Sequence, residues 1–230
     1  MFKKTNAIIK QTRADNRTIL TQQEAKLFAL DLDIPCPPAY NAKDENDAIR
    51  IAEELGYPVI LKALSSRILH KSDIGGVEKN LKNSDEVVRG YKKVLNSIKK
   101  IDKKAQVLVE RMEPSGLEAI IGLITESKLG AVVMIGLGGI LTEIFEDIAF
   151  RLAPIDEKQA KEAIDSLKTR NLFYGYRGQP PIDIDALIEL LVKISRVPEW
   201  FEDIEQIDLN PIILYKDGLN AVDIKVVLKK

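Results

Sequence analysis

The 230-residue sequence contains one cysteine and one histidine, and these scarcities exclude several kinds of protein. A single cysteine, Cys36, cannot form a disulfide within the chain, which is typical of proteins in a reducing compartment. No apolar run approaches the ~20 residues that a transmembrane helix needs, and the first residues show no signal-peptide pattern. We therefore expect a cytoplasmic protein with no membrane contact.

An excess of charge is also missing. The 34 basic and 35 acidic side chains leave a formal net charge of −1. Lysines gather between residues 92 and 104, but no series of aromatic residues accompanies them, and we interpret them as a solvated helix face. The sequence predicts no nucleic-acid partner, so any phosphate ligand must be bound by a local site.

The apolar fraction of 45% and charged fraction of 30% are typical of a globular protein with a sizeable core. Helical spacing of apolar residues predicts helices over 44–55, 84–100, 156–167 and 184–195. Short β-branched segments predict strands over 58–64, 105–112, 117–125, 130–135, 148–152, 207–214 and 220–228. We expect an α+β fold, with residues 1–20 as an arm or short leading helix, 21–105 as one subdomain and 106–230 as a second.

The most informative stretch is GYPVILKALSSRILHKSDIGGV, residues 56–77. Lys62 interrupts its apolar strand, and a buried ammonium needs an anion because desolvating an unpaired charge is costly. His70, which can titrate near neutral pH, follows in a polar segment that ends on Gly75 and Gly76. We predict that Lys62 binds nucleotide phosphate, that His70 carries a phosphoryl group, and that the glycines form a hinge. Taken singly, Lys62 is equally compatible with a strand-edge lysine and His70 with a surface histidine.

Two further motifs suit a nucleotide. The strand VLVERM ends near Glu110, whose carboxylate can accept a hydrogen bond from the exocyclic amine of adenine, although an ordinary strand end fits equally well. The run GLGG is not a dinucleotide fingerprint, because Leu141 takes the third glycine position and a strand follows. Gly138 and Gly139 can still bring backbone N–H groups close to a phosphate.

Acidic side chains predict a cation site and partners for a histidine. Asp208 and Asn210 alternate along one strand and so share a face, and Asp223 lies in a neighbouring apolar segment. Carboxylate and amide oxygens suit Mg²⁺, which takes its remaining ligands from water and nucleotide phosphates. A second cluster contains Glu143, Glu146 and Asp147; we expect it to contact a metal or a histidine.

Together these segments resemble the beta subunit of ADP-forming acetyl-CoA synthetase, in the ATP-grasp, succinyl-CoA synthetase-like superfamily. The resemblance is carried by LTQQEAK, GYPVILKALSSRILHKSDIGGV, LVERM, GLGGILTEIFEDIAFRLAP and IDLNPI. It implies an ATP-grasp fold of two α+β subdomains that grip ATP or ADP with Mg²⁺.

The resemblance also implies a role for each matching residue. The nucleotide-binding positions are Lys62 for phosphate, Glu110 and Met112 for the adenine hinge, and Glu118 for a further nucleotide contact. The Mg²⁺ ligands are Asn210 and Asp223. His70, in a loop over residues 65–77, is the phosphorylated histidine, and Asp208 and Glu143 are the carboxylates that steady it.

The reaction implied is acetyl-CoA + ADP + phosphate = acetate + CoA + ATP. The sequence contains no CoA-binding Rossmann domain and no second histidine, so the resemblance implies a CoA-binding alpha subunit with its own phosphohistidine, in an alpha2beta2 assembly. Two alternatives stay open from the residues. One is an ATP-grasp carboxylate ligase that works through a free acyl phosphate and needs no histidine. The other is a non-catalytic, nucleotide-sensing subunit.

Overall fold

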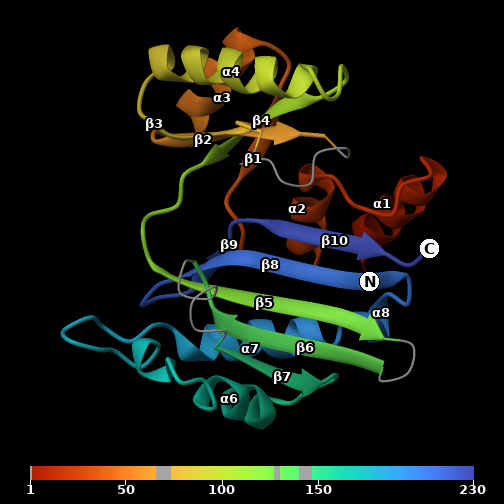
Figure 1. The fold of residues 1–230 in the computed structure, drawn as a ribbon, viewed down its shortest axis with the longest axis vertical. Helices are drawn as coiled ribbons and strands as arrows, with labels where there is room; N and C mark the ends of the chain where they lie inside the picture. Colours follow the sequence, from red (N-terminus) through yellow and green to blue (C-terminus); the bar gives the residue numbers. More distant parts are fainter. Residues whose placement is uncertain (1, 66–73, 127–129, 140–146) are drawn as a thin grey trace. The chain divides into compact units, whose positions relative to one another are not determined.

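The computed structural model describes residues 2–65, 74–126, 130–139 and 147–230 (Figure 1). The chain divides into two compact units. Unit 1 contains the chain up to Leu20, Ala25–Cys36 and Ser115–Lys230, and unit 2 contains Thr21–Glu24 and Pro37–Pro114. The expected α+β architecture is confirmed, but the division falls after Pro114 rather than after residue 105.

Unit 2 contains an antiparallel sheet with two helices on one face (Figure 1). The strand order is β1-β4-β2-β3, with bounds Ala39–Ala42, Gln106–Arg111, Val59–Leu64 and Val77–Leu81. The helices are α3 (Glu45–Leu55) and α4 (Ser84–Lys99). Because β4 lies between β1 and β2, it belongs to this unit, which explains why the boundary placed before residue 106 is wrong.

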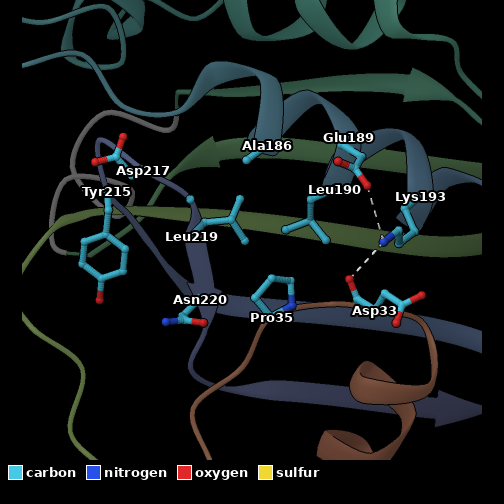
Figure 2. Close-up of a pocket in the computed structure, with 11 residues that line it drawn as sticks. Asp33, Pro35, Ala186, Glu189, Leu190, Lys193, Tyr215, Asp217, Leu219 and Asn220 are labelled. Atoms are coloured by element: carbon cyan, nitrogen blue, oxygen red, sulfur yellow. Dashed lines mark hydrogen bonds and ion pairs between the residues drawn. The ribbon is translucent and has the colours of Figure 1, made fainter.

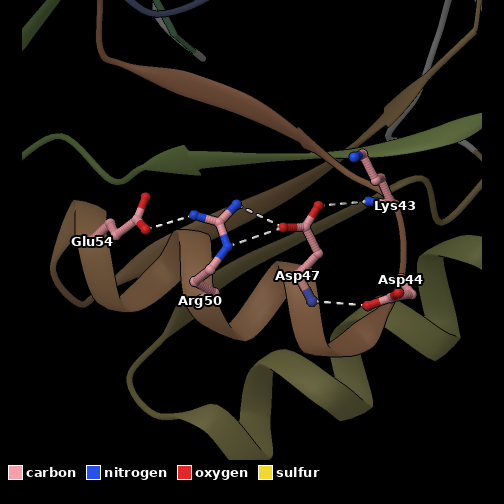
Figure 3. Close-up of polar contacts among 5 residues, drawn as sticks. All are labelled: Lys43, Asp44, Asp47, Arg50 and Glu54. Carbon is pink, nitrogen blue, oxygen red and sulfur yellow. Dashed lines mark hydrogen bonds and ion pairs between the residues drawn. The ribbon is translucent and has the colours of Figure 1, made fainter.

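Helix α3 begins at a network of local polar contacts (Figure 3). The Asp44 carboxylate accepts a hydrogen bond from the Asp47 backbone N–H at 2.9 Å, and the Asp47 carboxylate accepts one from the Lys43 N–H at 3.1 Å. Arg50 forms ion pairs with Asp47 one turn before it and with Glu54 one turn after it. The Asp44 cap contributes about 1 kcal/mol and each exposed ion pair less. These contacts therefore determine where α3 begins but add little to the stability of the fold.

Unit 1 contains a larger antiparallel sheet. In the described part of the chain its strand order is β10-β8-β5-β6-β7, and β9 pairs with β8. From β5 to β10 the bounds are Leu117–Glu126, Gly130–Leu137, Ile148–Leu152, Ile204–Leu214, Leu219–Ala221 and Ile224–Leu228. Among the described residues after β7, the helices are α6 (Glu157–Asp165), η1 (Arg170–Leu172), α7 (Ile184–Ser195) and α8 (Val197–Trp200). Figure 1 shows α6 and α7 on one face of the sheet, where the main hydrophobic core lies.

The first residues are part of unit 1 rather than an arm. Helix α1 (Lys3–Ala14) is joined to α2 (Gln22–Asp31) by hydrogen bonds from Thr5 to the Asp31 carboxylate. The Leu20 N–H then donates to the Val226 carbonyl oxygen at 3.1 Å, on strand β10. A capping box precedes α2, because Thr21 and Glu24 exchange side chain–backbone hydrogen bonds.

The predicted helices are confirmed, with bounds that agree within two residues. The predicted final strand is wrong in one respect: it is interrupted at Val222 and Asp223, which separate β9 from β10. Both short strands keep the same antiparallel register with β8, and the interruption falls opposite Asn210 and Pro211, where the proline has no N–H to donate to the ladder. Over the described ranges, no helix combines the length and apolar character needed to cross a membrane.

Helix α2 offers a test of the unit 1 core. Phe28 is fully buried and its ring lies 6.1 Å from that of Phe201, whereas Leu30 on the same helix is 56% exposed. We expect Phe28→Ala to lower the free energy of unfolding by about 3–5 kcal/mol, because it leaves a cavity. Leu30→Ala is the matched control and should change it by less than about 0.5 kcal/mol in urea denaturation. Equal losses would contradict this assignment of the core.

Candidate nucleotide-binding and phosphoryl-transfer site

Lys62 and Glu110 form a buried ion pair in unit 2. Lys62 lies on β2 and Glu110 on β4, and the distance from Lys62 Nζ to Glu110 Oε1 is 2.7 Å. Lys62 is 6% exposed and Glu110 is completely buried. The expectation that Lys62 lies in a buried strand and requires an anion is confirmed, and in this structure an anion is supplied by Glu110. Phosphate binding by Lys62 stays a prediction.

The predicted adenine hinge differs from expectation in its details. The Glu110 carboxylate is directed at Lys62, a partner that the sequence analysis did not assign to it. The Met112 N–H donates to the Pro58 carbonyl oxygen at 3.1 Å, so this amide is already used within the unit. The two residues do lie together where β4 ends, but an adenine contact stays a prediction for both.

The histidine segment is described only at its end. His70 lies outside the described residues, as does Glu143 in the second acidic cluster. Gly75 lies in a turn with a φ of +68°, a conformation that favours glycine. The Gly76 carbonyl oxygen accepts a hydrogen bond from the Ala63 N–H at 2.7 Å, which joins this end of the segment to β2. The hinge role of the two glycines stays a prediction.

Unit 1 brings the three predicted oxygen donors together. Asp208 and Asn210 lie on β8, and the Asn210 backbone N–H donates to the Asp223 carbonyl oxygen at 3.0 Å. Asp223 lies in the bend before β10 rather than within a strand. Asp208 itself is opposite Lys225 on β10 and Gly122 on β5.

Burial raises the pKa of the Asp208 carboxyl above its ordinary value. Lys225 opposes this increase and the Asp223 carboxylate adds to it. An ionised Asp208 is therefore destabilising in the chain alone, and a bound cation would offset that cost.

The donor set fits Mg²⁺. Asn210 and Asp223 provide oxygen ligands of the kind that this ion prefers, and the raised pKa of Asp208 indicates a place where negative charge lacks full compensation. In the part of the chain that the structure describes, no three His, Cys, Asp or Glu side chains converge as a metal cage. Two protein ligands are enough for an ion that keeps waters and shares phosphate oxygens.

Glu118 and the two glycines of the GLGG run also come together. The Gly138 N–H donates to the Glu118 carbonyl oxygen at 2.7 Å, so this amide is not available to a phosphate as expected. Gly138 is needed here because a Cβ would lie 2.9 Å from Glu118 backbone and side-chain carbons. Gly139 has a φ of +71° and lies beside the Glu118 carboxylate. A phosphate contact stays a prediction for Gly139 and Glu118.

Asp147 has a structural role that the sequence analysis did not identify. Its buried carboxylate accepts hydrogen bonds from the backbone N–H groups of Lys168 and Thr169, at 2.9 and 2.7 Å, and from the Thr169 hydroxyl. It therefore anchors the chain after α6, and a contact with a metal or a histidine stays a prediction. The partners lie more than twenty positions further along the sequence, so no local pattern indicates them.

A separate hollow in unit 1 contains none of the predicted site residues (Figure 2). Its volume is about 230 Å³, and Leu190, Leu219 and Pro35 line it. On its rim Lys193 Nζ donates to the Asp33 carbonyl oxygen at 3.0 Å and lies 3.8 Å from the Glu189 carboxylate. These polar groups satisfy one another, so the hollow does not extend the candidate site.

A family model described as an ATP-grasp domain matches residues 11–228, which defines the class of this protein. The matched range includes the candidate site residues described above in each of the two units. The chain belongs to the family of beta subunits of ADP-forming acetate–CoA ligases. It is 38% identical over 228 residues to subunit beta of acetate–CoA ligase (ADP-forming) I from Pyrococcus furiosus, and the match covers 98% of each chain. The resemblance seen in the sequence is thereby confirmed.

Solved structures of acetyl-coenzyme A synthetase 1 from Ca. Korarchaeum cryptofilum, described as dinucleotide forming, are also similar to this chain. One holds coenzyme A and acetyl-coenzyme A and has a phosphorylated phosphohistidine segment in the site I orientation; it is 34% identical, with a TM-score of 0.89. Another holds coenzyme A and Mg-AMPPCP, with the phosphohistidine segment pointing towards the nucleotide binding site; it is 35% identical, with a TM-score of 0.86. Each match covers 98% of this chain and 100% of the other.

Asp208 leads to a prediction about pH. Between its ordinary and its raised pKa the folded chain keeps a proton that the unfolded chain has lost, so stability falls as pH rises through that window. Asp208→Asn removes this cost. We expect the variant to have a higher melting temperature than the parent at about pH 7 without nucleotide or Mg²⁺, and little difference at about pH 4. Glu205→Gln, which removes an exposed charge from the same strand, is the control.

A lower melting temperature for Asp208→Asn at the higher pH would show that the carboxylate is stabilised, not strained, in the folded chain.

The close approach at Gly138 gives a second prediction. We expect Gly138→Ala to lower the free energy of unfolding by roughly 1–3 kcal/mol, because the new Cβ meets Glu118 backbone that cannot move aside. Gly122→Ala is the matched control, since its Cβ would meet chiefly the flexible Met134 side chain. It should cost less in urea denaturation, and equal costs would contradict the distinction.

Proposed function

We propose that this chain is the nucleotide-binding beta subunit of an ADP-forming acetyl-CoA synthetase. The reaction is acetyl-CoA + ADP + phosphate = acetate + CoA + ATP, and this chain performs the final transfer of a phosphoryl group to ADP. The observation that carries the proposal is the match over 98% of both chains to a beta subunit of this enzyme. The buried lysine of unit 2 and the oxygen donors of unit 1 are the groups that such a transfer requires.

A mobile carrier follows from the chemistry. In-line phosphoryl transfer needs the reacting atoms nearly in contact, so two distant pockets cannot exchange a phosphoryl group directly. We assign the carrier to His70. In the last step the bond from phosphorus to an imidazole nitrogen of His70 breaks, a β-phosphate oxygen of ADP bonds to phosphorus, and neutral imidazole is released. The Korarchaeum proteins, whose phosphohistidine segment has been seen in two orientations, support this assignment.

The remaining residues bind the nucleotide and Mg²⁺ and orient His70. Lys62 holds nucleotide phosphate, and Met112 and Glu118 contact the nucleotide at the hinge and beside Gly139. Asp208 and Glu143 accept hydrogen bonds from the imidazole of His70 and so orient the nitrogen that carries phosphorus. Asn210 and Asp223 hold Mg²⁺, which supplies charge neutralisation when bound.

The chain acts with a partner. We propose a CoA-binding alpha subunit that forms the acyl phosphate, carries its own phosphohistidine and passes the phosphoryl group to His70. An alpha2beta2 assembly in the cytoplasm is the arrangement that the resemblance favours.

The decisive experiment replaces His70. With the alpha partner present, we expect His70→Ala to abolish acetyl-CoA-dependent ATP synthesis while ADP binding by calorimetry stays largely intact, since the imidazole carries phosphorus and does not hold the nucleotide. Ser72→Ala, from the same segment, is the control and should retain synthesis.

Mass spectrometry should also find an acid-labile, base-stable phosphate on His70. Synthesis that persists in His70→Ala would favour a ligase working through a free acyl phosphate. ADP binding without turnover in the parent complex would favour a nucleotide-sensing subunit.

A further inference from the structure

Helices α3 and α4 cover one face of the unit 2 sheet (Figure 1). Strand alternation places the ion pair between Lys62 and Glu110 on the other face. The residues that alternate with them, Leu61 on β2 and Val109 on β4, belong to the core beneath those helices. Lys62 and Glu110 therefore project to the opposite face, and both remain buried there.

The register of the sheet sets their geometry. Ile60 is opposite Glu110 and Lys62 is opposite Leu108, so the two charged residues are diagonal neighbours on adjacent strands. Diagonal positions lie roughly 7–8 Å apart, a span that long side chains cross. The lysine must extend along the sheet toward the end of β4 to reach Glu110 Oε1 at 2.7 Å. The carboxylate therefore determines the direction in which the ammonium points.

We propose that Glu110 is a positioning residue: it holds the Lys62 ammonium where the nucleotide phosphate binds, and it does not recognise adenine. The inference rests on the proposed function, because that function supplies the ligand of Lys62. Its carboxylate has no exposed surface and is engaged by Lys62, which leaves recognition of the base to other groups at the hinge.

Charge and burial predict that loss of the Glu110 carboxylate weakens the binding of nucleotide phosphate. Removing the Glu110 carboxylate takes away the negative charge that lies 2.7 Å from the buried Lys62 ammonium, so the amine loses its proton more readily and is held less firmly in its position. Either change removes the cation from the phosphate. The carboxylate thus strengthens phosphate binding even though both groups are negative.

The test is a double-mutant cycle on ADP affinity, measured by calorimetry on the full chain without the alpha partner. We expect Glu110→Gln to weaken ADP binding by about tenfold, the loss typical of a hydrogen bond to a charged group. Lys62→Met should weaken it at least as much. The double variant should be no weaker than Lys62→Met, and the ratio of ADP to GDP affinity should not change in Glu110→Gln.

Additive losses, tighter ADP binding in Glu110→Gln, or a changed ratio of ADP to GDP affinity would each overturn the inference. Melting temperatures measured in parallel identify variants that fail to fold. If Glu110→Gln does not fold, Glu110→Asp, which keeps the charge but retracts it by one carbon, takes its place with the same expectations.

The outcome separates this inference from the proposed function. If the losses of ADP affinity in the two single variants are coupled but the alpha–beta complex synthesises no ATP, only phosphoryl transfer through His70 is contradicted. If the losses of ADP affinity are additive and the alpha–beta complex synthesises ATP, only the positioning role of Glu110 is contradicted. A parent chain that binds no ADP would overturn both.

Discussion

The buried ion pair of Lys62 and Glu110 links the two central strands of the unit 2 sheet. A buried charge needs compensation, so the observed pairing of β2 with β4 is favoured because it brings these two opposite charges together. A slip of one residue would turn Lys62 toward the core beneath α3 and α4, where apolar side chains offer no partner. The pair therefore specifies the sheet and, under the proposed function, places a cation for the nucleotide phosphate.

Unit 1 obtains its functional groups differently. Its antiparallel sheet brings together residues that lie far apart in the sequence, so that Glu118 on β5 meets Gly138 after β6, and Asp208 on β8 lies opposite Gly122 on β5. The cost appears at Asp208, whose pKa is raised by burial in the chain without ligands. A cost of this kind is typical of functional sites, and under the proposed function Asp208 faces a phosphohistidine close to a bound cation.

The two units thus supply complementary chemistry, a cation from one and oxygen donors from the other. Under the proposed function both kinds of group are needed, and His70, the single histidine of the sequence, carries the phosphoryl group. Carboxylates then orient the carrier, and a cation neutralises the phosphate charge of the nucleotide.

Local chemistry in the sequence determined the helices, the buried strand with Lys62 and the family, because periodicity, capping residues and the LHKSDIGGV segment are short-range signals. Tertiary structure alone decided which anion Lys62 meets, because Glu110 lies 48 positions away on another strand. It also assigned β4 to unit 2 and revealed Asp147 as an anchor for the backbone of Lys168 and Thr169. Strand pairing and buried hydrogen bonds join distant segments, and local patterns carry no record of those partners.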